Sequence, residues 1–134
     1  MASVAHFRNV VLDCPDPHAL AAFYAAVGGG TPVAEDDTWV VLQVPGGPRM
    51  AFQRAEGHTP PEWPRADHNG QQLHLDFDAG STWAEMDTAH ERVLALGARP
   101  LDEQDREKKD FVVYADPAGH PFCLCRIDHH LPPG

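Results

Sequence analysis

The residues best suited to chemistry gather in one short alternating stretch, QLHLDFD at 72–78. Successive side chains of a β-strand point to opposite faces, so a strand here would place His74, Asp76 and Asp78 on one face. An imidazole beside carboxylates can bind a metal ion, transfer a proton or simply be hydrated. The stretch therefore predicts a polar strand face whose role depends on the elements around it.

The cysteines are the second group that could do chemistry. The chain has three, Cys14, Cys123 and Cys125, and the last two alternate within the apolar stretch PFCLC. Their spacing differs from the Cys-x-x-Cys of zinc and redox motifs, and an odd number without a secretory signal favours reduced thiols. Apolar surroundings raise the pKa of a thiol, so packing is favoured over a Cys123 thiolate paired with His74.

Composition excludes several classes of function. The chain has 134 residues, of which 43% are hydrophobic and 22% charged, as in a folded domain. Its 20 acidic and 10 basic residues give a net charge of −10, which disfavours nucleic acid and suits solubility or a cationic ligand. No apolar run approaches the roughly 20 residues of a membrane span, and no secretory signal is recognisable. We expect a cytoplasmic protein that binds neither nucleic acid nor membrane.

The elements that must position these residues recur in the same order in both halves. In the first half, a strand, a helix and three strands are predicted at 7–13, 17–27, 31–35, 38–44 and 49–54. Asp16 as N-cap and Pro17 as first helical residue mark the start of that helix. In the second half the order returns at 72–78, 81–97, 98–101, 111–115 and 121–127, with a charged connection at 102–110. Thr82 and Glu85 have the spacing of a capping box.

This recurrence indicates an internal repeat. Aligning the two halves puts Asn9 opposite His74, and residues 50–53 opposite residues 122–125. Each half then forms a βαβββ module, with one helix over a small sheet that buries little apolar surface by itself. The sequence therefore predicts one α+β domain of two paired modules. Module one spans about 6–54 and module two about 71–127, with a linker at 55–70 and a tail at 128–134.

On these features the chain resembles the vicinal oxygen chelate superfamily, and within it the glyoxalase-like, bleomycin-resistance and dioxygenase branch. The resemblance covers residues 6–127 and rests on the paired modules and on three stretches, VVLDCPDPHALAAFYAAV, LHLDFD and DPAGHPFCLC. It implies two curled, mixed sheets that form a cup for a small molecule, and a homodimer. It also implies four inward-facing positions, on the first and last strands of each module, that bind a divalent metal.

Carried over position by position, that metal set is altered in this chain. The first module offers Asn9 and Ala51, with Gln53 one step further along the same face, and the second offers His74 and Cys123. Hard divalent cations prefer oxygen and nitrogen donors, whereas zinc accepts an imidazole and a thiolate but needs further ligands. The resemblance thus implies an altered or absent metal site with His74 as its remaining ligand, and no other cofactor.

The candidate ligand-binding residues all lie on predicted strands, and they are Asn9, Trp39, Gln53, Asp76, Tyr114 and Cys123. The two amides would orient a ligand by hydrogen bonds, and Asp76 would either hold the imidazole of His74 or face solvent. Trp39 and Tyr114 would stack on a ligand or pack in the core. Trp63 in the linker would cap the cup or anchor the loop.

Two classes of function follow. The first is binding and sequestration of a small molecule, of the resistance type and without catalysis, which the altered metal set favours. The second is a metal-dependent lyase, isomerase or dioxygenase that uses His74 as a ligand. A metal-free enzyme with His74 as catalytic acid or base lies between the two.

Overall fold

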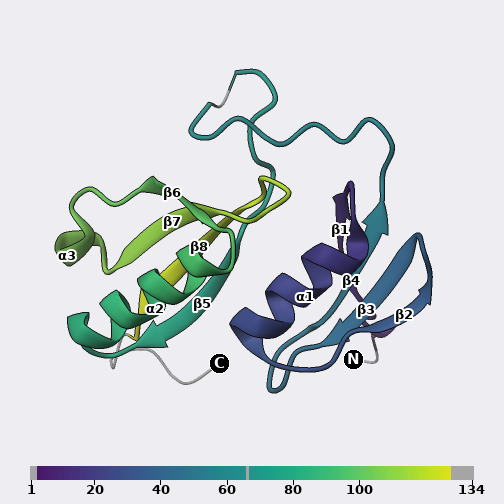
Figure 1. The fold of residues 1–134 in the computed structure, drawn as a ribbon, viewed down its shortest axis with the longest axis horizontal. Coiled ribbons are helices and arrows are strands. Elements are labelled where there is room, and N and C mark those ends of the chain that lie inside the picture. Colours follow the sequence, from purple (N-terminus) through teal and green to yellow (C-terminus); the bar gives the residue numbers. More distant parts are fainter. Residues whose placement is uncertain (1–2, 66, 128–134) are drawn as a thin grey trace. The chain divides into compact units, whose positions relative to one another are not determined.

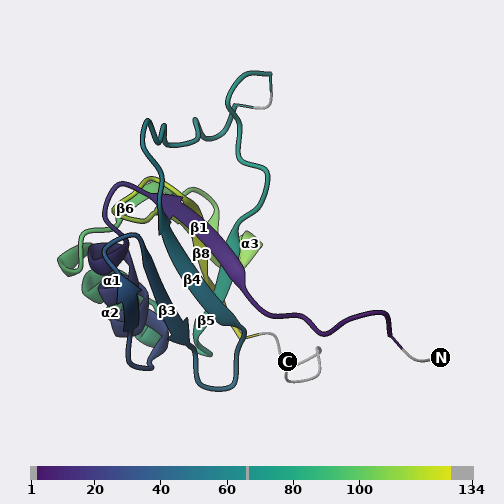
Figure 2. The same cartoon turned by 90° about the vertical axis from the view of Figure 1, so that its right-hand side faces the viewer.

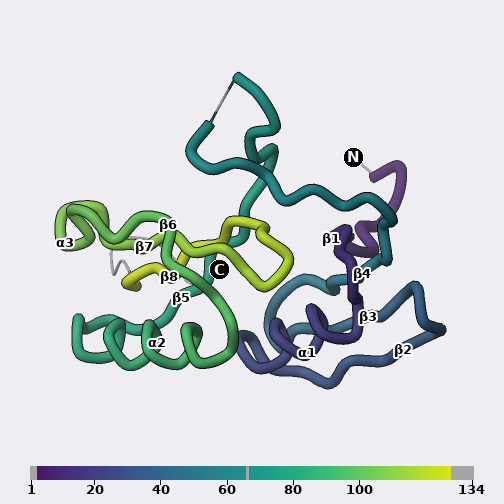
Figure 3. The backbone as a smooth tube through the Cα atoms, turned by 45° about the horizontal axis from the view of Figure 1, so that its top comes forward, coloured from purple at the N-terminus to yellow at the C-terminus, as the bar shows by residue number. Residues whose placement is uncertain are grey.

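The chain divides into two compact units, Met1–His58 and Thr59–Gly134, which we call the first and the second unit. A computed structural model describes residues 3–65 and 67–127. Each unit contains one β-sheet with its own helix (Figure 1). The boundary between the units falls inside the predicted linker, whose described residues contain neither helix nor strand (Figure 3).

The first unit is a four-stranded mixed sheet with one long helix. Its elements are β1 (Val10–Cys14), α1 (Pro17–Gly28), β2 (Val33–Asp36), β3 (Trp39–Gln43) and β4 (Arg49–Arg54). The strand order is β1-β4-β3-β2, in which β1 and β4 are parallel and the other pairs antiparallel. The first described residues, from residue 3, lead away from β1 (Figure 2).

The second unit repeats this arrangement and adds one short helix. Its elements are β5 (Leu75–Gly80), α2 (Trp83–Ala95), β6 (Arg99–Asp102), α3 (Arg106–Lys109), β7 (Phe111–Ala115) and β8 (Pro121–Arg126). The strand order is β5-β8-β7-β6, again with the first pair parallel. The α+β class and the two tandem βαβββ modules predicted from the sequence are therefore confirmed.

The register of the strands confirms the alignment of the two halves. In the first unit Val11 pairs with Ala51, and in the second unit Asp76 pairs with Cys123. Asn9 precedes Val11 by two residues, as His74 precedes Asp76. The same backbone position in each unit thus carries the amide and the imidazole.

Both long helices begin where the sequence predicts. The Asp16 carboxylate accepts hydrogen bonds from the backbone N–H groups of His18 and Ala19, and Pro17 is the first helical residue. Thr82 and Glu85 form both hydrogen bonds of a capping box at the start of α2. These caps satisfy backbone donors that no helical carbonyl can reach.

One face of each sheet packs against its helix. In the first unit Tyr24 of α1 stacks on Phe52, with ring centroids 5.8 Å apart. In the second unit Tyr114 stacks on Phe122 at 5.4 Å, and both are buried. Because side chains alternate along a strand, the neighbours of these residues point to the face opposite the long helix.

Several local predictions are wrong. The first strand, predicted at 7–13, begins at Val10 as β1, and Phe7 is 75% exposed. Strand β5 begins at Leu75, so His74 lies immediately before it, and Leu73 is 61% exposed instead of joining the apolar face. The predicted charged connection at 102–110 contains α3, whose flanking residues Asp105 and Asp110 take left-handed backbone conformations. Four helical residues are too few for a recognisable hydrophobic period.

In the part of the chain that the structure describes, no helix is long and apolar enough to cross a membrane.

Candidate functional site

The parallel ladder between β5 and β8 brings three side chains of different chemistry together. Asp76 lies directly opposite Cys123, and His74 precedes Asp76 by two residues on the same side. The Nε2 atom of His74 is 3.3 Å from Oδ1 of Asp76. One donor atom from each of the three residues lies within 4.8 Å of the other two. We call this group the His-Asp-Cys cluster.

The cluster forms one corner of a cavity on the sheet face that α2 leaves free. The volume is about 260 Å³, and the lining residues are Trp63, Gln71, His74, Asp76, Phe111, Val113, Cys123 and Cys125. Phe111 and Val113 belong to β7, and Cys123 and Cys125 belong to β8. The cavity therefore has an apolar floor made by two strands and a polar corner made by the start of β5.

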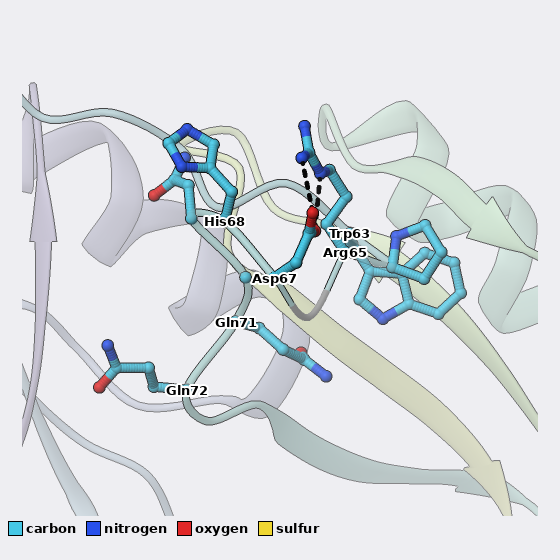
Figure 4. Close-up of a pocket in the computed structure, with 9 residues that line it drawn as sticks. Trp63, Arg65, Asp67, His68, Gln71 and Gln72 are labelled. Atoms are coloured by element: carbon cyan, nitrogen blue, oxygen red, sulfur yellow. Dashed lines mark hydrogen bonds and ion pairs between the residues drawn. The ribbon is translucent and has the colours of Figure 1, made fainter.

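The segment before β5 supplies the remaining two lining residues, Trp63 and Gln71. It also encloses a separate, polar hollow of its own, shown in Figure 4. Arg65 donates two hydrogen bonds to the carboxylate of Asp67 there. Asn69 ties the segment together, since its carbonyl accepts a hydrogen bond from the N–H of Glu62. The segment is thus held by internal bonds, and Trp63 and Gln71 line both hollows.

The cavity is electrostatically suited to positive charge. Burial, together with the nearby negative charge of Asp76, raises the pKa of the Cys123 thiol to about 12. Burial and the charges of Asp76 and Asp78 raise the pKa of Cys125 to about 11. Among the described residues that line the cavity, none is a lysine or an arginine. Both thiols are therefore protonated near neutral pH, which disfavours Cys123 as a nucleophile.

The donor set distinguishes between classes of metal. A zinc-like ion binds imidazole, carboxylate and thiolate at about 2.0–2.3 Å in a tetrahedron, which places donor atoms roughly 3.3–3.6 Å apart. The His74–Asp76 separation of 3.3 Å already has that value. The exposed fractions of these two side chains, 44% and 60%, leave them room to rotate toward Cys123. A manganese-like ion prefers oxygen and nitrogen donors, so the buried Cys123 sulfur makes the cluster a poor site for it.

Three other predicted ligand-binding residues belong to the other unit of the chain. Asn9, Trp39 and Gln53 belong to the first unit, where Trp39 and Gln53 are paired across β3 and β4. The Oδ1 atom of Asn9 is buried without a hydrogen-bond partner among the described residues. Their contact with a ligand stays a prediction.

Tyr114 takes the second of its two predicted roles, core packing. It is 1% exposed, and its hydroxyl lies 2.7 Å from Nδ1 of His90 on the helix side of the sheet. Burial, with the charge of Glu103, raises its pKa well above the usual range. Its neighbour Val113 points into the cavity instead.

The sequence analysis did not predict that four of the lining residues would lie at the cavity. Strand alternation relative to Cys123 would have identified Cys125, and the antiparallel ladder of β7 and β8 adds Phe111 and Val113. Gln71 lies in an irregular segment without periodicity, so no local signal identifies it. Trp63 lines the cavity, as one of its two predicted roles required.

The chain is similar to one known protein family in sequence and to several solved structures in fold. The sequence model of the family described as "Glyoxalase-like domain" matches residues 9–125. A glyoxalase/bleomycin resistance/dioxygenase family enzyme from Burkholderia phytofirmans is 20% identical, with 87% of this chain and 94% of that chain covered and a TM-score of 0.67. No curated protein matches in sequence.

Two fosfomycin resistance proteins share the same fold. FosX from Mesorhizobium loti is 15% identical over 96% of both chains, with a TM-score of 0.66. A variant of FosX from Listeria monocytogenes, solved with Mn(II) and 1S,2S-dihydroxypropylphosphonic acid, is 14% identical over 96% of this chain and 94% of that chain, with a TM-score of 0.67. At these identities the likeness establishes the fold alone.

Proposed function

Because this chain belongs to the glyoxalase-like domain family, we propose that it binds and sequesters a small molecule in the cavity of the second unit. The supporting observation is the combination of an apolar floor with one polar corner, His74 and Asp76. Ligand sites commonly have this composition, since apolar walls supply affinity and a few polar groups fix orientation.

The size and charge of the cavity define the class of ligand. A volume of about 260 Å³ is just below the roughly 300–1,000 Å³ of drug-sized sites. The carboxylate of Asp76 attracts a positively charged head group, and the indole of Trp63 offers a face for a cation or a flat ring. The ligand that fits best is therefore a small amine with an apolar or aromatic body.

A pair of probes of similar shape and opposite charge tests this proposal. Tryptamine and indole-3-acetate are titrated by calorimetry into protein freed of metal with EDTA. We expect saturable binding of tryptamine and much weaker binding of indole-3-acetate, because only the amine complements Asp76. Equal or stronger binding of the anion would contradict the proposal.

Two substitutions on one strand supply the matched control. Asp76→Asn should weaken tryptamine binding about tenfold, as expected from loss of a charge-assisted contact worth about 1.5 kcal/mol. Asp78→Asn should leave binding nearly unchanged, because Asp78 does not line the cavity. An equal effect of both substitutions would point to general surface charge rather than to this site. Mass spectrometry of the recovered ligand should show an unaltered molecule.

A metal-dependent or acid–base enzyme is the second candidate, and the His-Asp-Cys cluster supports it. Three protein donors leave a coordination position free for a substrate, which is the arrangement of catalytic metal sites. A bound divalent cation would supply Lewis-acid chemistry there. His74, Asp76 and Cys123 would hold it. Without a metal, His74 would exchange a proton with the ligand while Asp76 orients its ring. A covalently altered ligand in the mass spectrum would favour this candidate over sequestration.

A further inference from the structure

We propose that the first unit has a binding site of its own, formed by Arg8, Arg49 and Phe7, for an aromatic oxyanion with two negative charges. The site is a hollow of about 510 Å³ beside the turn between β3 and β4, where Gln43 and Gly47 also line it. It shares no residue with the cavity of the second unit. The inference therefore goes beyond the proposed function and does not depend on it.

Strand pairing brings the two arginines to the same end of the sheet. In the antiparallel ladder of β3 and β4, Arg49 is the direct partner of Gln43, so the two side chains leave the sheet next to each other. Strand β1 is parallel to β4, and its Val10 pairs with Met50. Arg8 is two residues before Val10 and thus lies at the end of β4 where Arg49 begins the strand.

The turn between β3 and β4 gives the hollow a fixed wall. The Gly47 N–H donates a hydrogen bond to the Val44 carbonyl at 3.0 Å. Pro45 and Gly46 lie between them, and the φ of +71° at Gly46 suits the third position of a type II turn. The Nε2 atom of Gln43 donates to the carbonyls of Val44 and Gly47, at 3.2 and 3.1 Å. Because the turn is already held in place, little ordering of this wall opposes ligand binding.

The two arginines carry positive charge that the folded chain does not neutralise. Arg65, Arg106 and Arg126 each form an ion pair with an aspartate. Within residues 3–65 and 67–127, no carboxylate forms such a pair with Arg8 or Arg49. None of the described residues that line the hollow is acidic, although the chain has a net charge of −10. A bound anion would offset the repulsion between the two guanidinium groups.

The guanidinium groups and an exposed ring define the class of ligand. A guanidinium donates hydrogen bonds in a planar fork that matches the oxygens of a phosphate or a carboxylate. Phe7 is 75% exposed beside the two arginines, so its ring is open to stacking by a flat ligand. Two positive charges are matched by two negative ones. The ligand that fits best is therefore an aromatic phosphate or an aromatic dicarboxylate.

Three probes that share a benzene ring test the site. Phenyl phosphate, isophthalate and benzyl alcohol are titrated by calorimetry into the full chain, in about 0.15 M NaCl to screen distant charges. We expect saturable binding of one anion per chain and no saturable binding of benzyl alcohol. The anion that binds more tightly shows whether the two arginines act on one charged group or on two. Inorganic phosphate should bind about fivefold more weakly than phenyl phosphate, because it has no ring to stack on Phe7.

Matched substitutions locate the contacts. Arg8→Gln and Arg49→Gln should each weaken anion binding about tenfold, as expected from loss of a charge-assisted contact worth about 1.5 kcal/mol. Arg54→Gln is the control, because Arg54 is an exposed arginine at the opposite end of β4 and does not line the hollow. Phe7→Ala should weaken the binding of phenyl phosphate to the level of inorganic phosphate and leave inorganic phosphate unchanged.

Amide chemical shifts of ¹⁵N-labelled protein place the anion on the chain and show that each variant is folded. We expect the largest changes at Gly47 and Arg49. Three results would overturn the inference: no saturable binding of either anion, equal effects of Arg54→Gln and Arg49→Gln, and shift changes confined to the second unit. Asp76→Asn should leave the binding of phenyl phosphate unchanged while it weakens that of tryptamine. The anion site and the proposed function can therefore fail independently.

Discussion

Asp76 makes a contact in the folded chain that its position in the sequence does not reveal. Read along one strand, it is a neighbour of His74 that either holds the imidazole or faces solvent. In the sheet it is also the direct partner of Cys123, a residue 47 positions away along the chain, from 76 to 123. The carboxylate thereby links an exposed imidazole to a buried sulfur, and His74 gains a third donor that the sequence alone does not provide.

The buried thiol of Cys123 should make the stability of the protein depend on alkaline pH. Its pKa is raised from an ordinary 9.0 to about 12, so the folded chain holds the proton more tightly than the unfolded chain. This contribution is complete below about pH 9 and is lost as the pH rises toward 12. At about pH 10.5 we expect a loss of about 2 kcal/mol from this thiol, at 1.36 kcal/mol per pH unit.

Urea unfolding of the wild type and of Cys123→Ala at neutral and alkaline pH measures this loss. The difference between the two proteins at neutral pH reports packing, and the change in that difference with pH reports the titration. We expect the free energy of unfolding to fall less steeply in the variant. Parallel pH profiles would show that Cys123 does not titrate in this range.

At the scale of elements, the helix starts are the features that sequence predicts best. Asp16 and Thr82 act locally, because a cap is formed by residues within three positions of each other. Strand edges are less predictable, since β5 begins after His74 and not before it. The short helix α3 was missed because four residues carry no periodic signal.

The capping box of α2 gives a prediction at this scale. Thr82→Ala removes the side-chain acceptor for the N–H of Glu85 and should lower the free energy of unfolding by about 1 kcal/mol. Thr88→Ala is the matched control, because the Thr88 hydroxyl donates to the Ala84 carbonyl within the helix and caps nothing. Chemical denaturation should place Thr88→Ala within about 0.5 kcal/mol of the wild type. Equal losses would refute the capping role.

At the scale of the whole molecule, the repeat is a property of both sequence and structure. Two units share strand order and register, although the equivalent positions carry different chemistry. The second unit has the His-Asp-Cys cluster, and the first has Asn9, Val11 and Ala51. Two copies of one fold have therefore diverged in the residues that face away from the helices.

The homodimer predicted from the resemblance is tested at this scale. Sedimentation equilibrium should give twice the chain mass of 14.7 kDa. A single species of 14.7 kDa at micromolar concentration would contradict the prediction. Fractionation of cells tests the predicted cytoplasmic location.

The sequence by itself determined the α+β class, the tandem βαβββ modules and the starts of both long helices. These features follow from local patterns of hydrophobicity and capping and from a repeat that can be aligned by eye. Only the tertiary structure decided that Asp76 and Cys123 are neighbours, that Tyr114 belongs to the core, and that Gln71 reaches the cavity. The physical reason is that strand pairing joins residues far apart in the chain, and its register is set by the packing of the whole sheet against its helix.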